Sequence, residues 1–207
     1  MRLVLTADTH GLHEMIKVPD GDVFICAGDM SMTGKASDVE NYARWLRSLP
    51  HKHKILVAGN HDWIFEKKPK RALALLGDSC TYLRDNHVVI DGVKFWGSPW
   101  QPWFYDWAFN LKRGKEIAEK WSWIHANTDV LITHGPPYRF LDGCVDGREV
   151  GCQDLADRIS VVKPKVHVFG HIHHSYGKMQ FGETTYVNAS VCTARYVPSN
   201  IPIVIDI

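Results

Sequence analysis

Apolar, partly β-branched runs recur five times along the chain, and each run ends abruptly in a turn of polar residues. Runs of this length and branching predict buried strands. Because glycine or polar residues follow each run, the side chains just beyond it are expected at one edge of a sheet, where ligands bind in layered α/β proteins. The five runs are Arg2 to Ala7, Asp22 to Ala27, Ile55 to Ala58, Asp129 to Thr133 and Lys165 to Phe169.

Segments with apolar residues three and four positions apart lie between the runs and predict amphipathic helices. The first follows a capping box, Ser37 to Glu40, and ends at Pro50. The succession of strand, strand, helix and strand is typical of a layered α/β domain. The other helices are predicted at Trp63 to Leu76 with an interruption at Pro69, at Lys112 to Asn127, and at Gln153 to Val161.

Alternating residues elsewhere predict further β-structure. Asp91-Gly92 lies at the centre of the stretch from Tyr82 to Trp96, which predicts a β-hairpin. Three short segments near the C-terminus are expected to form a second sheet or its edge. No repeat, linker or low-complexity tract divides the chain, so residues 1–207 are expected to form a single domain. The three segments are Thr184 to Val187, Val191 to Tyr196 and Ile201 to Ile205.

Composition narrows the classes of function. The 207 residues are 45% hydrophobic, enough for one full core, and 24 Lys and Arg against 23 Asp and Glu leave a net charge of +1. The chain as a whole therefore lacks the excess of positive charge that would attract nucleic acid. No apolar run approaches the roughly 20 residues that span a bilayer. The five cysteines form no C-x-x-C pair and nothing at the N-terminus resembles a signal peptide, so a cytoplasmic location is expected.

Metal-capable side chains follow each of the five apolar runs. One such ending has a plain explanation, because an Asp or Asn often caps a turn. Five apolar runs that each end in such side chains, in the order that a layered sheet requires, predict a shared crevice that binds metal. Carboxylate, imidazole and one amide without thiolate suit Mn²⁺, Fe or Zn²⁺ rather than a structural zinc cage. The side chains are Asp8 and His10, Asp29, Asn60 and His61, His134, and His171 and His173.

The same endings form blocks of sequence in a characteristic order. They resemble the calcineurin-like metallophosphoesterase family. Within that family the chain is most similar to the small metallophosphoesterase-domain proteins, the MPPED type, in the short segments Gly97 to Gln101, Trp107 to Phe109 and Thr133 to Pro137. The resemblance implies a two-sheet α/β sandwich flanked by helices, with a metal site at the C-terminal ends of the strands. The blocks are Asp8-x-His10, Gly28-Asp29, Gly59-Asn-His-Asp62, Thr133-His-Gly135 and Gly170-His-x-His173.

The resemblance implies a centre of two metal ions, with Mn²⁺ favoured and Fe or Zn²⁺ as alternatives. Two cations roughly 3.5–4 Å apart repel each other, so a shared carboxylate belongs between them. This agrees with the division of ligands that the family implies. One ion would be held by Asp8, His10 and His173, the other by Asn60, His134 and His171, and Asp29 would bridge them.

The expected reaction is phosphoester hydrolysis. A hydroxide that bridges the ions would attack phosphorus, His61 would protonate the leaving group as general acid, and Asp62 would orient the His61 ring. His61 is alternatively a third structural ligand. The subgroup implies phosphodiesters, including cyclic nucleotides. Alternatives are a phosphomonoesterase or nuclease of the same fold, or a non-catalytic metal-binding scaffold.

Substrate contacts are sought in an aromatic segment and among the arginines. The segment Trp100 to Phe109 is expected either to stack a nucleobase, with Trp103 as the candidate, or to form a secondary core or subunit contact. The candidate cations are Arg113, Arg139 and Arg148. The expected partner is a small phosphate ester, with a nucleotide among the candidates. The oligomeric state stays open.

Overall fold

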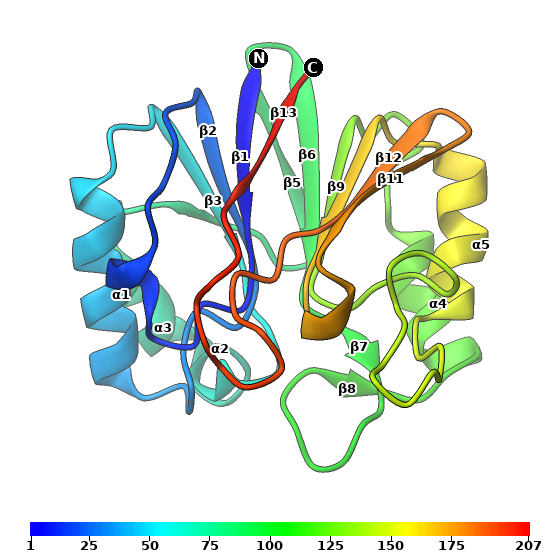
Figure 1. The fold of residues 1–207 in the computed structure, drawn as a ribbon, viewed down its shortest axis with the longest axis horizontal. Coiled ribbons are helices and arrows are strands. Elements are labelled where there is room, and N and C mark those ends of the chain that lie inside the picture. The colour runs from blue at the N-terminus through cyan, green and yellow to red at the C-terminus, as the bar shows by residue number, and fades with distance from the viewer.

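Two β-sheets pack face to face at the centre of the protein, and helices cover the outer face of each (Figure 1). The computed structural model describes residues 1–207. One sheet has five strands in the order β13-β1-β2-β3-β4, and the other has six in the order β11-β12-β10-β9-β6-β5. The predicted two-sheet α/β sandwich is confirmed.

The five-stranded sheet is built around three parallel strands, each a predicted apolar run. β1 (Arg2–Thr6) pairs with β2 (Val23–Ala27), and β2 pairs with β3 (His53–Val57), so all three C-terminal ends lie at the same edge. β4 (Thr81–Tyr82) extends the sheet, and β13 (Ile203–Asp206) pairs antiparallel with β1. The prediction of a second sheet for Ile201 to Ile205 was therefore wrong, because this segment completes the first sheet.

The six-stranded sheet contains the predicted hairpin. β5 (Asn86–Ile90) and β6 (Val93–Ser98) are joined by Asp91 and Gly92, whose φ angles of 48° and 83° are those that a tight two-residue hairpin turn requires. The parallel strands β9 (Val130–Thr133) and β10 (Val166–Phe169) follow. The other strands are β11 (Gly177–Phe181) and β12 (Thr184–Asn188), with β7 (Gln101–Pro102) and β8 (Asn110–Leu111) as a separate pair.

The helices lie where they were predicted but differ at their ends, and the segment predicted at Trp63 to Leu76 forms two helices. The helix predicted at Lys112 to Asn127 is shorter, and the Pro69 interruption separates α2 from α3. The predicted capping box was wrong, since Oδ2 of Asp38 accepts a hydrogen bond from the backbone N–H of Lys35 at 3.0 Å, which makes Lys35 the cap. The helices are α1 (Ala36–Ser48), α2 (Trp63–Lys67), α3 (Pro69–Leu76), α4 (Lys115–Ser122) and α5 (Gln153–Val162), with 3-10 turns η1 (His13–Met15) and η2 (His173–Ser175).

Three apolar layers hold the sandwich together. Alternate residues of a central strand enter different layers: Leu3 and Leu5 pack between the sheets, whereas Val4 packs under α1 to α3. A third layer lies between the six-stranded sheet and helices α4 and α5, around Trp96 and Trp121. Strands covered on both faces must be apolar at every position, which explains the continuous runs in the sequence. No helix combines the length and the apolar character needed to cross a membrane.

The segment Val191 to Tyr196, predicted as a strand, is instead a loop fixed by its own hydrogen bonds. The backbone N–H of Val191 donates to the carbonyl of Ala7, and the backbone N–H of Thr193 donates to the carbonyl of Val197. Tyr196 has a φ of 57°, which interrupts any strand. The loop therefore returns over the ends of the central strands rather than extending a sheet.

Candidate metal centre

The parallel strands of both sheets deliver the predicted ligands to one place. Asp8 and His10 follow β1, Asp29 follows β2, and Asn60 follows β3. His134 follows β9, and the segment after β10 supplies His171 and His173. Backbone hydrogen bonds brace each set, from the N–H of Asp8 to the carbonyl of Gly28 and from the N–H of Gly170 to the carbonyl of His134. The two sets are joined by the backbone N–H of His171, which donates to Oδ2 of Asp8 at 2.9 Å.

The backbone at four of these side chains adopts an unusual conformation. Asp8, His10, Asp29 and His171 have φ angles of 56°, 45°, 53° and 69°. Positive φ is uncommon outside glycine and carries a conformational cost, which is typically found at functional sites. The tertiary structure therefore stabilises a strained backbone at four separate points of one cluster.

Close backbone approach at three glycines makes room for the cluster. A Cβ atom on Gly170 would meet Oδ2 of Asp8, and one on Gly59 would meet Oδ1 of Asp29. At Gly28, where φ is 104°, a Cβ would collide with the imidazole of His134 and with the backbone of Gly59. These glycines are needed because the ligand side chains occupy the space that a larger residue would take.

The first group of ligands comprises Asp8, His10 and His173, as the resemblance implied. The Nε2 atoms of His10 and His173 are 3.1 Å apart, and Nε2 of His173 is 3.4 Å from Oδ1 of Asp8. The distance from Nε2 of His10 to Oδ1 of Asp8 is 4.0 Å. Three potential metal ligands thus converge, of which Asp8 and His10 are buried and His173 is half-buried at the wall of a pocket.

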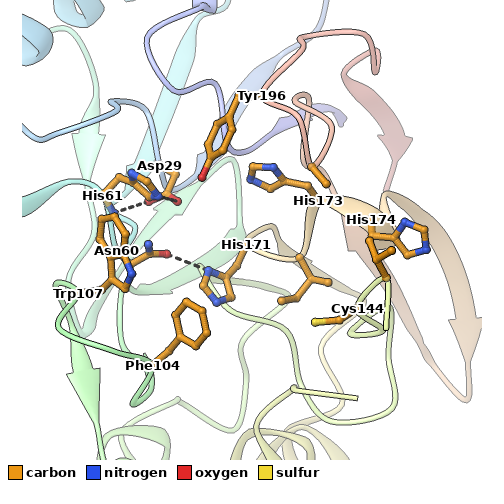
Figure 2. Close-up of a pocket in the computed structure, with 13 residues that line it drawn as sticks. Asp29, Asn60, His61, Phe104, Trp107, Cys144, His171, His173, His174 and Tyr196 are labelled. Carbon is orange, nitrogen blue, oxygen red and sulfur yellow. Dashed lines mark hydrogen bonds and ion pairs between the residues drawn. The ribbon is translucent and has the colours of Figure 1, made fainter. Parts of the chain in front are cut away.

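The second group comprises Asn60, His134 and His171, with Asp29 beside it. Oδ1 of Asn60 is 2.8 Å from Nδ1 of His171 (Figure 2) and also 2.8 Å from Nε2 of His134. Oδ2 of Asp29 is 3.4 Å from Nε2 of His134 and 3.9 Å from Nε2 of His10. Asp29 therefore faces both groups, the position that a bridging carboxylate requires.

Backbone carbonyls fix the tautomers of the ligand histidines. Nδ1–H of His134 donates to the carbonyl of Ala27 at 2.9 Å, and Nδ1–H of His173 donates to the carbonyl of Thr193 at 3.0 Å. Each bond leaves the Nε2 lone pair directed at the cluster. The donor set, its burial and these tautomers all fit a centre of two metal ions.

Charge interactions keep the carboxylates ionised despite their burial. Burial raises the pKa of Asp8, but His173 opposes this and the resulting pKa is about 2. Burial also acts against the Asp29 anion, yet His134 holds the pKa of Asp29 well below its usual range. Burial lowers the pKa of His134, but the neighbouring Asp29 raises it to about 9, whereas burial lowers the pKa of His171 to about 3. A cation that binds His134 must therefore displace a proton.

His61 lies at the edge of the cluster rather than within it. Its Nδ1–H donates to the carbonyl of Met32 at 2.8 Å, and its Nε2 faces Oδ2 of Asp29 at 4.0 Å. The ring packs on Trp107 with a centroid distance of 4.3 Å (Figure 2). His61 also lies close enough to His10 and Asp29 to act as a ligand with them, so both interpretations from the sequence remain.

Asp62 does not orient the His61 ring, and that prediction was wrong. Its carboxylate instead accepts hydrogen bonds from the backbone N–H groups of Gly59, Met30 and Ser31 and from Oγ of Ser31. The carbonyl of Met32 takes the place on His61 that was predicted for Asp62. Asp62 thus ties the turns after β2 and β3 together, and the turn geometry directs its side chain away from His61.

A pocket of about 290 Å³ opens above the ligands, and the predicted substrate contacts do not line it. Trp103 is 65% exposed outside the pocket. Arg113 donates to the carbonyls of Val150 and Gly151, and Arg148 pairs with Asp146 at 2.7 Å. The guanidinium of Arg139 lies over the Tyr138 ring, 5.3 Å from its centroid.

Aromatic side chains other than the predicted Trp103 form the walls of this pocket. Trp107 and Phe104 come from the aromatic segment that the sequence marked, although Trp103 was the candidate there. Tyr196 covers the opposite side, next to His173, with a distance of 5.5 Å between the ring centroids (Figure 2). Its ring centroid is also 4.8 Å from that of His10. No signal in the sequence near Tyr196 pointed to the site.

Comparison with known proteins agrees with the geometry. The calcineurin-like phosphoesterase family matches residues 1–175. Human metallophosphoesterase domain-containing protein 1 is 45% identical over 230 residues, which cover 100% of this chain and 71% of the human protein. A UPF0046 protein of Caenorhabditis elegans is 40% identical over 228 residues, which cover 100% of this chain and 81% of the relative.

Solved structures show the same fold at low sequence identity. The crystal structure of TT1561 of Thermus thermophilus matches with a TM-score of 0.64 at 14% identity, covering 90% of this chain and 88% of that chain. GAP50, the anchor in the inner membrane complex of Plasmodium, matches with a TM-score of 0.53 at 12% identity, covering 92% of this chain and 71% of that chain. The family model over residues 1–175 and the relatives at 45% and 40% identity show that the chain belongs to the calcineurin-like metallophosphoesterase family.

Proposed function

We propose that this protein hydrolyses phosphodiesters, cyclic nucleotides among them, with a centre of two divalent metal ions. Membership of the family makes it a metal-dependent phosphoesterase. The observation that carries the proposal is the pair of ligand groups that share Asp29. One ion would be held by Asp8, His10 and His173, the other by Asn60, His134 and His171, and Asp29 would be the carboxylate shared between them.

When bound at these residues, divalent ions would supply a hydroxide nucleophile at neutral pH and would neutralise charge on the phosphoryl oxygens. The mixed set of carboxylate, amide and imidazole ligands favours Mn²⁺, and Fe or Zn²⁺ also suit it. The protein contributes a fixed arrangement, since backbone carbonyls hold the imidazoles of His134 and His173 in one tautomer. Two buried carboxylates leave the loaded site net positive, which attracts a phosphate ester without any global basic charge.

His61 is the proposed general acid. Because its Nδ1–H is engaged by the carbonyl of Met32, the other ring nitrogen faces the pocket beside Asp29. A proton on that nitrogen is placed to reach the oxygen of a departing alcohol. The ring of Trp107 limits the rotation of His61 by packing against it. The alcohol thus leaves in neutral form, which lowers the barrier for poor leaving groups.

The pocket walls support a substrate that carries a ring. Phe104 and Trp107 lie on one side of the ligands and Tyr196 on another, and a planar base can stack on such faces. Trp107 and Phe104 therefore replace Trp103 as the proposed stacking residues. The five cysteines are all free, which supports the proposal of a reducing, cytoplasmic location.

The test compares substrates on metal-loaded protein. Purified protein is stripped of metal, reloaded with Mn²⁺, Fe²⁺ or Zn²⁺, and assayed with bis(p-nitrophenyl) phosphate, p-nitrophenyl phosphate, and 2′,3′- and 3′,5′-cyclic nucleotides. We expect turnover that depends on metal and favours diesters over the monoester, with cyclic nucleotides above the chromogenic diester. A preference for the monoester would overturn the diester assignment. Cyclic nucleotides no better than the chromogenic diester would overturn the nucleotide assignment.

A protein with Asp29→Asn serves as the matched control, because it removes the proposed bridging charge while it keeps the shape of the side chain. We expect it to bind less metal and to lose turnover of every ester. Absence of both metal and turnover in the native protein would instead favour a non-catalytic scaffold.

A further inference from the structure

A second hollow, of about 450 Å³, adjoins the pocket above the metal ligands. The loop 193–195 and Asn200 form one side of it, and the segment from His173 to Tyr176 forms the other. His173, His174 and Ala194 line both cavities, so the hollow continues the pocket on the side away from His61 and Trp107 (Figure 2). We name it the Arg195 hollow.

Arg195 is the only lysine or arginine among the residues that line the pocket and the Arg195 hollow, and no carboxylate lines the hollow. Its guanidinium forms no ion pair and no hydrogen bond with the protein, whereas Arg113 and Arg148 are both engaged elsewhere. His174 adds an exposed imidazole to the same wall. The hollow therefore offers an uncompensated cation to an anionic group.

The loop that carries Arg195 is tied to a metal ligand. The carbonyl of Thr193 accepts hydrogen bonds from Nδ1–H of His173 at 3.0 Å and from the backbone N–H of Tyr196 at 2.8 Å. Nδ2 of Asn200 donates to the carbonyl of Ser190 at 2.9 Å, which fixes the end of the loop. Arg195 is thus held at a set position relative to His173, although it lies beyond residue 175, where the family match ends.

We propose that the Arg195 hollow binds a second phosphate of the substrate while the scissile phosphodiester lies at the metal ligands. Guanidinium groups bind phosphate oxygens through paired, charge-assisted hydrogen bonds, and a dianionic terminal phosphate gains more from such a cation than a monoanionic diester does. The inference rests on the proposed function and extends it: the preferred substrate is a diester whose nucleoside carries a terminal phosphate and is retained when the alcohol leaves at His61.

The test uses two chromogenic esters that differ only in the second anion, thymidine 5′-(p-nitrophenyl phosphate) and the same ester with a 3′-phosphate. Release of p-nitrophenolate from Mn²⁺-loaded protein gives kcat/KM for each. We expect the ester with two phosphates to be favoured, through its lower KM, by roughly fivefold, the range for a partly exposed charge pair. Arg195→Gln should bring this ratio close to one. Arg44→Gln, which removes an exposed arginine on α1, should keep it.

The remaining outcomes separate this inference from the proposed function. Turnover of both esters with no preference, or a preference that Arg195→Gln leaves intact, overturns the Arg195 hollow as a subsite and leaves the diesterase standing. Turnover of neither ester overturns both. If the two esters are turned over equally and the one-phosphate ester responds to inorganic phosphate in a way that disappears in Arg195→Gln, the hollow takes a free anion only, and the assignment to substrate is overturned.

Discussion

Oγ of Ser190 lies 2.6 Å from Oδ2 of Asp8, and both side chains are fully buried. Oδ1 of Asn188 is nearly as close to the hydroxyl, at 2.7 Å, but it already accepts the backbone N–H of Ser190. A hydroxyl has one proton to donate, and an ionised carboxylate is the stronger acceptor. Ser190 therefore supports a proposed metal ligand from a segment beyond the end of the family match.

Replacing Ser190 by alanine is expected to weaken metal binding. The change removes the hydrogen bond that fixes the Asp8 carboxylate, and loss of such a partner typically costs 10- to 100-fold in metal affinity. Titration of metal-free protein with Mn²⁺, followed by calorimetry, measures the effect. Ser160→Ala is the matched control, because Oγ of Ser160 bonds a carbonyl within α5, away from the site. Equal affinities for both variants would contradict the role of Ser190.

Replacing His61 by alanine is expected to lower kcat while the metal content stays at two ions. General acids contribute roughly 10²- to 10⁴-fold, and the loss should be larger for an alkoxide leaving group than for p-nitrophenolate, which needs no proton. Rates on a methyl and a p-nitrophenyl ester of the same nucleotide, with metal measured by emission spectrometry, provide the comparison. A fall in metal content with no dependence on the leaving group would make His61 a ligand. His125→Ala, an exposed histidine, is the control.

The sequence was sufficient to predict the central strands and to place the candidate ligands at their ends, but not what lies between them. Each ligand follows an apolar run, so its position along the chain already places it at a strand end. The role of Asp62 depends on how two turns pack, and the sequence carries no sign of that packing. Tyr196 and Ser190 come from a loop whose path is set by contacts with Ala7 and Asp8, far away in the sequence. Long-range packing of this kind has no local pattern.

Asp62 is expected to contribute to stability rather than to the chemical step. Asp62→Ala would leave three backbone N–H groups and one hydroxyl without their acceptor in a fully buried place. Unsatisfied buried groups cost about 1–3 kcal/mol each, so a loss of about 3 kcal/mol in the free energy of unfolding is a conservative expectation. Urea denaturation of metal-free protein measures it. Ser31→Ala, which removes one of these donors, should cost about 1 kcal/mol. Unchanged stability with a lower kcat would restore the role predicted from sequence.

A buried histidine outside the metal site is expected to make the protein sensitive to acid. The hydroxyl of Thr133 donates to the carbonyl of Gly135, so it accepts from Nε2–H of His167 at 2.8 Å. Nδ1 of His167 is then an unprotonated, buried atom without a partner, and the rings of Phe169 and Tyr186 lie beside it. Burial lowers the pKa of His167 to about 3.

The direction of the pH effect on stability is set by the different pKa values of His167 in the folded and unfolded states. In the unfolded chain His167 takes up a proton near pH 6.5, whereas in the folded protein its lowered pKa is about 3. The free energy of unfolding therefore does not change with pH through this residue above pH 6.5 and falls as the pH drops from 6.5 to 3. The loss is about 1.4 kcal/mol per pH unit, or about 2 kcal/mol between pH 6.0 and 4.5. His167→Gln keeps an N–H for Thr133 but cannot be protonated. Urea denaturation at both pH values should therefore show a pH dependence that is smaller by about 2 kcal/mol in His167→Gln than in the native protein. The same pH dependence in both proteins would mean that His167 is protonated in the folded state.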